Sequence, residues 1–138
     1  MQTYIGVKCV KAEPMVKDDK DGYKVVYPDG YENWSPKDEF EKAYFQIERE
    51  DKLSQGDIDR FISISGYQDM SDSKTTLVRA RLLTGFVDYE SSSCVDPTNY
   101  NGRIGYEIGM EHIKDRLWKM LGFVLQWARY GLEEKIDK

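Results

Sequence analysis

The chain offers few of the residue combinations that catalyse reactions. It contains one histidine, His112, and two cysteines, Cys9 and Cys94, which lie far apart in the sequence. A Cys–His nucleophilic pair or a histidine-based zinc site would need partners gathered from distant segments. Gly102-Arg103-Ile104-Gly105 is too short for a dinucleotide fingerprint, and no glycine-rich phosphate loop occurs. We therefore expect a protein that is not an enzyme and that has no catalytic residues, metal site or cofactor.

Residues suited to binding a nucleotide gather between positions 86 and 116. Such a ligand needs a flat ring on which its base can stack, an amide that recognises a purine edge, and cations for its phosphates. The candidates are the aromatics Phe86 and Tyr89, the amide Asn99, and the cations Arg103, Lys114 and Arg116. Each also has a structural role open to it, because a tyrosine can fill a core, an asparagine can cap a helix and an arginine can pair with a carboxylate.

Charge and composition narrow the classes of partner. The chain has 138 residues, 40 % of them hydrophobic and 33 % charged, and a formal net charge of −5. Proteins that bind along DNA or RNA are usually basic, so a nucleic-acid polymer is disfavoured, whereas a small phosphorylated ligand is not. No apolar run approaches the roughly 20 residues that cross a bilayer, and the N-terminal segment lacks the features of a signal peptide. We expect a cytoplasmic protein, in the cytosol of the cell that makes it, that binds neither a nucleic-acid polymer nor a membrane.

Residues 1–48 predict a small N-terminal module of antiparallel strands and one helix. The alternation of Ile5, Val7 and Cys9 predicts a strand over 3–10. Two further strands are predicted over 23–27 and 31–34, joined by the turn residues Pro28-Asp29-Gly30. Ser35-Pro36 predicts the start of a helix, with serine as the N-cap and proline in the first helical position.

Residues 52–131 predict a second module, and the whole chain an α+β fold. Ser54 predicts the cap of a short helix that ends near 61, and residues 66–73 predict a loop. A β-hairpin is expected over 75–84 and 86–91 around Thr84-Gly85; a two-residue loop would place Arg81 opposite Asp88, Arg79 opposite Glu90 and Tyr89 opposite Ala80. A long helix is expected from about 101 to 121, broken near Gly122 and followed by a second segment over 123–130.

Two glycines, Gly105 and Gly109, stand one turn apart on that helix. Each costs a helix about 1 kcal/mol relative to alanine, so a close approach of another backbone is expected to offset the cost. That backbone is either a strand of the same chain or a helix of a second copy. The aromatic residues near the end of the helix are typical of interfaces, and we expect a homo-oligomer, with burial inside the monomer as the equal alternative. These aromatics are Trp118, Phe123, Trp127 and Tyr130.

The sequence resembles phage proteins in two segments. Residues 4–44 resemble a short N-terminal module of phage and prophage proteins, and residues 54–125 are similar to a small phage early-protein family of unassigned function. The first resemblance is carried by Tyr4-Ile5-Gly6, Ala12-Glu13-Pro14-Met15, Gly22-Tyr23, Asp29-Gly30-Tyr31, Trp34-Ser35-Pro36-Lys37 and Phe40-Glu41-Lys42-Ala43-Tyr44. The second is carried by Ser54, Gly85-Phe86, Glu90-Ser91, Cys94-Val95-Asp96-Pro97, Asn99-Tyr100, Gly105, Ile108, Glu111 and Trp118-Lys119-Met120-Leu121-Gly122.

In this order the two modules resemble the Thoeris anti-defence proteins of the first type. Those phage proteins act as sponges for the cyclic ADP-ribose isomer that bacterial TIR-domain sensors make, and related members hold cyclic di- or trinucleotides. The resemblance implies sequestration without cleavage, in pockets formed where subunits meet. It implies that Tyr89 is the stacking aromatic, Asn99 the amide and Arg116 the guanidinium, with Phe86, Arg103 and Lys114 as the nearest alternatives. A phage protein that modulates a host protein through its aromatic C-terminal helix is the alternative function.

Overall fold

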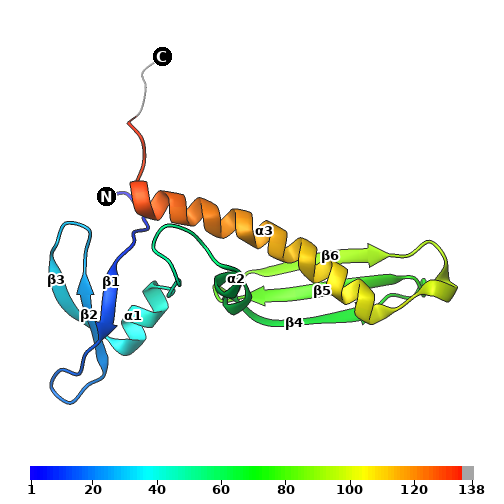
Figure 1. Cartoon of the computed structure of the whole chain (residues 1–138), viewed down its shortest axis with the longest axis horizontal. Coiled ribbons are helices and arrows are strands. Elements are labelled where there is room, and N and C mark those ends of the chain that lie inside the picture. The colour runs from blue at the N-terminus through cyan, green and yellow to red at the C-terminus, as the bar shows by residue number, and fades with distance from the viewer. Residues whose placement is uncertain (135–138) are drawn as a thin grey trace. The chain divides into compact units, whose positions relative to one another are not determined.

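The computed structural model describes residues 1–134 and divides the chain into two compact units. Unit 1 combines Met1–Ile47 with the segment that begins at Gly122, and unit 2 spans Glu48–Leu121. Two three-stranded antiparallel sheets and three α-helices form within the described residues, which confirms the α+β fold class (Figure 1). None of these helices combines the length and the apolar character that crossing a bilayer requires.

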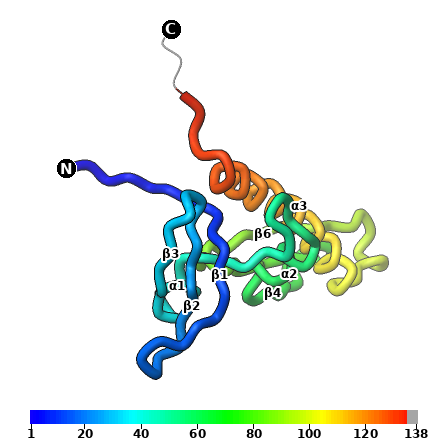
Figure 2. The backbone as a smooth tube through the Cα atoms, turned by 60° about the vertical axis from the view of Figure 1, so that its left-hand side comes forward, coloured from blue at the N-terminus to red at the C-terminus, as the bar shows by residue number. Residues whose placement is uncertain are grey.

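Unit 1 contains the first sheet and one short helix. Its strands are β1 (Lys11–Pro14), β2 (Gly22–Val26) and β3 (Glu32–Pro36), which lie side by side in that order (Figure 2). The predicted turn after β2 is confirmed, with Gly30 at a φ of +89° that favours glycine. Helix α1 (Lys37–Ala43) follows, and its Phe40 ring stacks on Tyr23 of β2 with centroids 4.4 Å apart.

Two predictions for unit 1 are wrong in detail. Residues 3–10 form no strand. Strand β1 begins at Lys11, which pairs with Val26, the last residue of β2, so the residues before Lys11 have no partner in β2. Ile5, placed on a buried face by the alternation, is instead 81 % exposed. Ser35 does not cap α1, since it pairs with Tyr23 inside β3; Pro36 takes the N-cap position without a side-chain hydrogen bond.

In unit 2 the short helix α2 (Gln55–Phe61) begins as predicted. The Ser54 hydroxyl accepts a hydrogen bond from the Asp57 backbone N–H, and the Asp57 carboxylate accepts one from the Ser54 N–H, which completes a capping box. The same buried carboxylate accepts the Glu48 N–H at 3.1 Å and a hydrogen bond from Arg60. Asp57 therefore ties the segment before α2 to both ends of the helix.

The second sheet has three strands, one more than predicted. Strand β4 (Ile62–Asp69) occupies part of the segment expected to be a loop, and it pairs along β5 (Thr75–Leu82). Its sequence, Ile-Ser-Ile-Ser-Gly-Tyr-Gln-Asp, mixes a glycine with small polar residues and gives a weak strand signal. Pairing with β5 forms this strand despite its composition.

The register of the hairpin between β5 and β6 (Val87–Ser93) differs from the prediction by one residue. The Leu82 N–H donates to the Phe86 carbonyl, so the loop has three residues and ends with Gly85 at a φ of +87°. Arg79 therefore lies opposite Tyr89, and Ala80 lies opposite Asp88. The predicted pairs Arg81–Asp88 and Arg79–Glu90 do not form, and Tyr89 shares a face with the arginines instead of with Ala80.

Helix α3 (Gly102–Tyr130) follows a single 3₁₀ turn, η1 (Pro97–Asn99), and runs without the break expected near Gly122. Leu121 and Phe123 continue the helical hydrogen bonding across this glycine, whose intrinsic cost of about 1 kcal/mol is too small to interrupt a helix of this length. In unit 2 the helix covers one face of the sheet, with Val78 and Ala80 packed against Met110 and Ile113.

The glycine stripe of α3 faces a strand of the same chain. A β-carbon added at Gly105 would lie 2.8 Å from the Thr76 β-carbon, and one added at Gly109 would lie 3.0 Å from the Val78 β-carbon. Both glycines are buried. The first of the two predicted alternatives is therefore correct: the backbone that approaches the helix is β5.

Replacing Gly109 by alanine is expected to destabilise the fold by about 1–3 kcal/mol, because the clash with Val78 exceeds the gain in helix propensity. Gly122→Ala is the matched control: no heavy atom of the described residues lies within 4 Å of its added β-carbon. It is expected to raise stability by about 0.5–1 kcal/mol. Urea unfolding of both variants checks this; equal stabilisation by the two would contradict the close approach.

Candidate functional site

The six residues predicted to bind a ligand lie in several places within unit 2. Phe86 and Tyr89 are 58 % and 54 % exposed, at the hairpin loop and on β6 respectively. Asn99 belongs to η1, and the three cations belong to α3. Among the six, the structure shows direct contact between Arg116 and Tyr89, through a hydrogen bond of 3.1 Å from the guanidinium to the Tyr89 carbonyl. It does not bring Asn99 or Arg103 to this pair.

Arg116 is held by the carboxylates of β6. Its Nε donates to Asp88 Oδ2 at 3.0 Å and its Nη1 to Glu90 Oε2 at 2.5 Å, while His112 Nδ1 lies 3.7 Å from the same Glu90 oxygen. The hydrogen bond from Arg116 lowers the pKa of Glu90, and the two carboxylates raise the pKa of Arg116. With two anions around one guanidinium, this cluster does not favour an additional phosphate.

The other predicted cations also have carboxylate partners. Lys114 Nζ lies 2.9 Å from Asp59 Oδ1, and this hydrogen bond lowers the pKa of Asp59. Arg103 Nε lies 3.5 Å from Glu107 Oε1 on the exposed surface of α3. At the start of the helix, Asn101 Oδ1 accepts from the Arg103 and Ile104 N–H groups, so a side chain of the protein already occupies the position expected for an anion.

The face of the sheet that α3 does not cover carries two arginines that the sequence analysis left out of the site. By strand alternation Arg79 and Arg81 point away from the buried Val78 and Ala80, and both are exposed. Tyr89 lies directly opposite Arg79, whose other cross-strand neighbour is Gly66, a residue without a side chain. We call the surface formed by Arg79, Arg81 and Tyr89 the open face.

The charge of the open face is not neutralised by its own unit. Within the described residues, no carboxylate forms an ion pair with Arg79 or Arg81, in contrast to Arg103, Lys114 and Arg116. The sequence does contain a signal for this face, because these arginines alternate with the apolar residues Val78, Ala80 and Leu82. The predicted register, wrong by one residue, paired both arginines with acidic residues and so concealed their unpaired charge.

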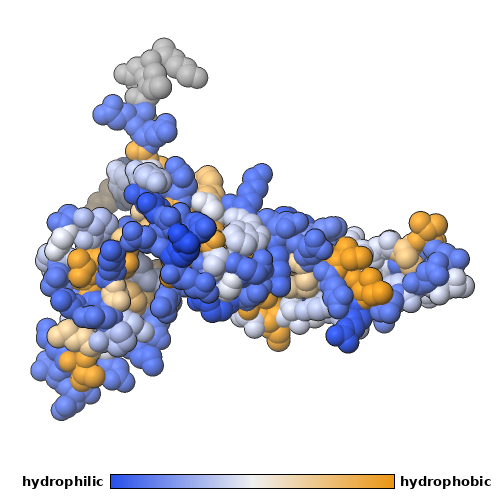
Figure 3. Space-filling view, in the orientation of Figure 1, coloured by the Kyte–Doolittle hydropathy of each residue, from blue (hydrophilic) through white to orange (hydrophobic). Residues whose placement is uncertain are grey.

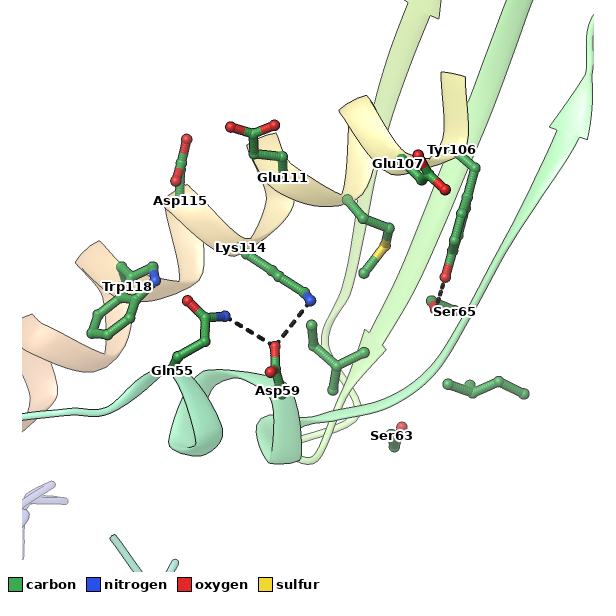
Figure 4. A pocket seen from close by; sticks show the side chains of 13 residues that line it. Gln55, Asp59, Ser63, Ser65, Tyr106, Glu107, Glu111, Lys114, Asp115 and Trp118 are labelled. Carbon is green, nitrogen blue, oxygen red and sulfur yellow. Dashed lines mark hydrogen bonds and ion pairs between the residues drawn. The ribbon is translucent and has the colours of Figure 1, made fainter. Parts of the chain in front are cut away.

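A groove of about 780 Å³ lies on the other side of the sheet, between α2, the start of β4 and α3 (Figure 4). Ile62, Met110 and Trp118 give it apolar walls, and Asp59 joins Lys114 and Gln55 at one end. Glu107, Glu111 and Asp115 of α3 border it, but the side chains of Glu111 and Asp115 project from the far side of the helix, away from Asp59 and Gln55 (Figure 4). Lys114 is already paired with Asp59, so among the described residues the groove offers no free cation to a phosphorylated ligand.

Exposed apolar side chains also occur along α3 (Figure 3). Ile104 and Ile108, one turn apart near its start, are 54 % and 41 % exposed. In unit 1, Phe123 and Tyr130 are 70 % and 66 % exposed, while Trp127 is half-buried. Single exposed apolar side chains are normal on a protein surface, whereas clusters of them are typical of sites that contact other proteins.

Comparison with known proteins identifies one family. The model of the phage protein (N4 Gp49/phage Sf6 gene 66) family matches residues 53–128, which is more than half of the chain. The match takes in β4, β5 and β6, and with them the open face and the groove. Neither the curated proteins nor the solved structures contain a match to this chain.

Arg116→Gln is expected to raise the pKa of Glu90 toward its ordinary value of 4.5. A carboxylate whose pKa is lowered by folding adds stability above its unfolded pKa and loses it as the pH falls, so the wild-type protein should lose this contribution below about pH 4.5. Carboxyl NMR titration of Glu90 measures the shift. Arg103→Gln, which removes an exposed pair on the same helix, should leave Glu90 unchanged; an equal shift in both variants would contradict the assignment.

Proposed function

The chain belongs to the phage protein (N4 Gp49/phage Sf6 gene 66) family, and on this premise we propose that it binds and sequesters a nucleotide immune signal without cleaving it. The ligand class that we propose is a cyclic ADP-ribose isomer, with cyclic oligonucleotides as the wider class. Sequestration of that signal would block TIR-dependent Thoeris immunity. The observation that carries the proposal is the open face, where an exposed tyrosine lies beside two arginines that have no carboxylate partner in the described part of the chain.

The open face supplies two of the three chemistries that such a ligand needs. The ring of Tyr89 can stack on adenine, and a guanidinium can form two parallel hydrogen bonds to a phosphate. Successive residues on one face of a strand are about 6.5–7 Å apart, so Arg79 and Arg81 are spaced to contact both phosphates of a pyrophosphate. In a chain of net charge −5, this local positive charge also guides an anion to one surface.

This proposal retains Tyr89 as the stacking residue and gives Arg116 a different task. Arg116 holds Asp88 and Glu90, which flank Tyr89 in β6, and donates to the Tyr89 carbonyl. It is therefore a positioning residue that fixes the strand behind the ring. The three residues of the open face are exposed at the surface of unit 2, so we infer that a second copy of the chain closes over a ligand bound there. We accordingly propose a homo-oligomer with the ligand held between copies.

A second candidate function is modulation of a host protein through the C-terminal part of α3. The exposed Phe123 and Tyr130 favour it, because aromatic side chains are enriched where proteins meet. The two functions differ in what co-purifies with the protein. A small molecule released unchanged on heating supports sequestration, whereas a stoichiometric protein partner lost on Phe123→Ala supports the second candidate.

Isothermal titration of about 50 μM protein with cyclic ADP-ribose isomers and cyclic dinucleotides tests the proposal. Wild-type protein should bind at least one of them. Arg79→Gln and Tyr89→Ala should each weaken that binding by about tenfold or more, since each removes an interaction worth about 1–3 kcal/mol.

Arg103→Gln is the matched control, because it removes an exposed arginine of unit 2 away from the open face, and it should leave affinity unchanged. Absence of heat with every ligand would rule out the function. Binding that depends on Arg103 but not on Arg79 would keep the function and move the site to α3. Recovery of a hydrolysed ligand would contradict sequestration without cleavage.

A further inference from the structure

Strand β4 places a side-chain amide beside the open face. Tyr67 lies opposite the buried Val78, and the centroid of its ring is 5.4 Å from that of Tyr106 on α3. Because neighbouring side chains along a strand point to opposite sides, Gln68 projects from the other side of the sheet, the side that carries Arg79. The Gln68 side chain is exposed and forms no hydrogen bond within residues 1–134, so its amide is free to bind a ligand.

Two residues before Gln68, Gly66 leaves space on the same side of the sheet. It lies opposite Arg79, its φ is not positive, and no heavy atom of the described residues lies within 4 Å of an added β-carbon. Neither the backbone conformation nor packing within the described residues therefore requires a glycine here, in contrast to Gly105 and Gly109. A glycine weakens the interior of a strand, and it often marks a place where a ligand comes close to the backbone.

The three strands of the sheet carry different chemistry in a fixed order. A row formed by Tyr89 of β6, Arg79 of β5 and Gly66 of β4 crosses the sheet, and Gln68 borders its β4 end. Adjacent strands are about 4.8 Å apart, so about 9.6 Å separates the backbone of the tyrosine from that of the glycine, with the arginine between them. A ligand with its base on Tyr89 and its phosphates at Arg79 therefore directs toward β4 the group that is joined to the far side of those phosphates.

We propose that Gly66 and Gln68 form a subsite for the second sugar of the ligand, the ribose joined to the far side of the pyrophosphate. This inference rests on the proposed function and adds a specificity-determining residue to it. Gly66 admits the sugar ring close to the backbone of β4. The Gln68 amide offers an acceptor oxygen and a donor NH₂ group, which match neighbouring ribose hydroxyls because a hydroxyl can both donate and accept. A site that bonds a ligand hydroxyl selects against an analogue that lacks it.

Titration calorimetry on the full chain tests the subsite with two ligands. One is the cyclic ADP-ribose isomer that wild-type protein binds most tightly, and the other is ADP, which lacks the second sugar. Gln68→Leu should weaken binding of the isomer by about fivefold to tenfold, the effect of losing one or two hydrogen bonds, and should leave binding of ADP unchanged. Gln126→Leu is the matched control, because it removes an exposed amide of α3 that belongs to unit 1, and it should change neither affinity.

Gly66→Val fills the space over β4 and should weaken binding of the isomer by about tenfold or more. Its urea midpoint of unfolding should equal or exceed that of wild-type protein, because valine favours a strand and the added β-carbon contacts no described atom.

Three results would overturn the subsite and leave the proposed function intact. The first is equal binding of the isomer by Gln68→Leu and Gln126→Leu, and the second is undiminished binding by Gly66→Val. The third is an equal loss of ADP and of the isomer in Gln68→Leu, because the amide would then contact the base or the phosphates. Wild-type protein that binds no cyclic ADP-ribose isomer would also overturn the subsite, and the proposed function fails with it if the cyclic dinucleotides give no heat either.

Discussion

Unit 2 depends on the close approach of α3 to β5. Glycine at positions 105 and 109 lets the helix backbone lie against Thr76 and Val78, side chains that are fully buried. Larger residues at these positions would lift the helix off the sheet and open the contacts of Ile113 and Leu117, which are also buried. Each of the two glycines costs the helix about 1 kcal/mol of stability relative to alanine. The close packing that is possible without a side chain offsets this cost.

This approach determines which surfaces remain available. Since one helix covers one face of a three-stranded sheet, the residues of β5 that point the other way stay at the surface. Lys114 and Arg116 of α3 lie within reach of carboxylates from α2 and β6, and they form ion pairs with Asp59, Asp88 and Glu90. The arginines of β5, on the opposite face, have no such neighbours in the described residues. Whether a cation of unit 2 has a carboxylate partner thus depends on which face of the sheet it lies on.

Much of this architecture is predictable from the residues, and the failures have physical causes. The helix cap at Ser54 was predicted correctly because capping involves residues close in sequence. The close approach at the α3 glycines was predicted correctly because two glycines one turn apart in a helix leave few alternatives. The register of the hairpin depends on whether the loop has two or three residues, which the tertiary context decides, and one residue reversed the face of Tyr89. Strand β4 forms through a partner distant in sequence, whereas 3–10 has a strand pattern and no partner strand. Local patterns do not contain that information.

The same alternation of side chains along β5 keeps charged groups of opposite sign on the two sides of the second sheet. Arg79 and Arg81 make the open face positive, while Glu107, Glu111 and Asp115 lie on α3, at the other side of the sheet. The sheet lies between the two sets, so within the described residues neither forms ion pairs with the other. The cations that a phosphorylated ligand would need therefore stay on one side of the sheet, apart from the carboxylates of α3.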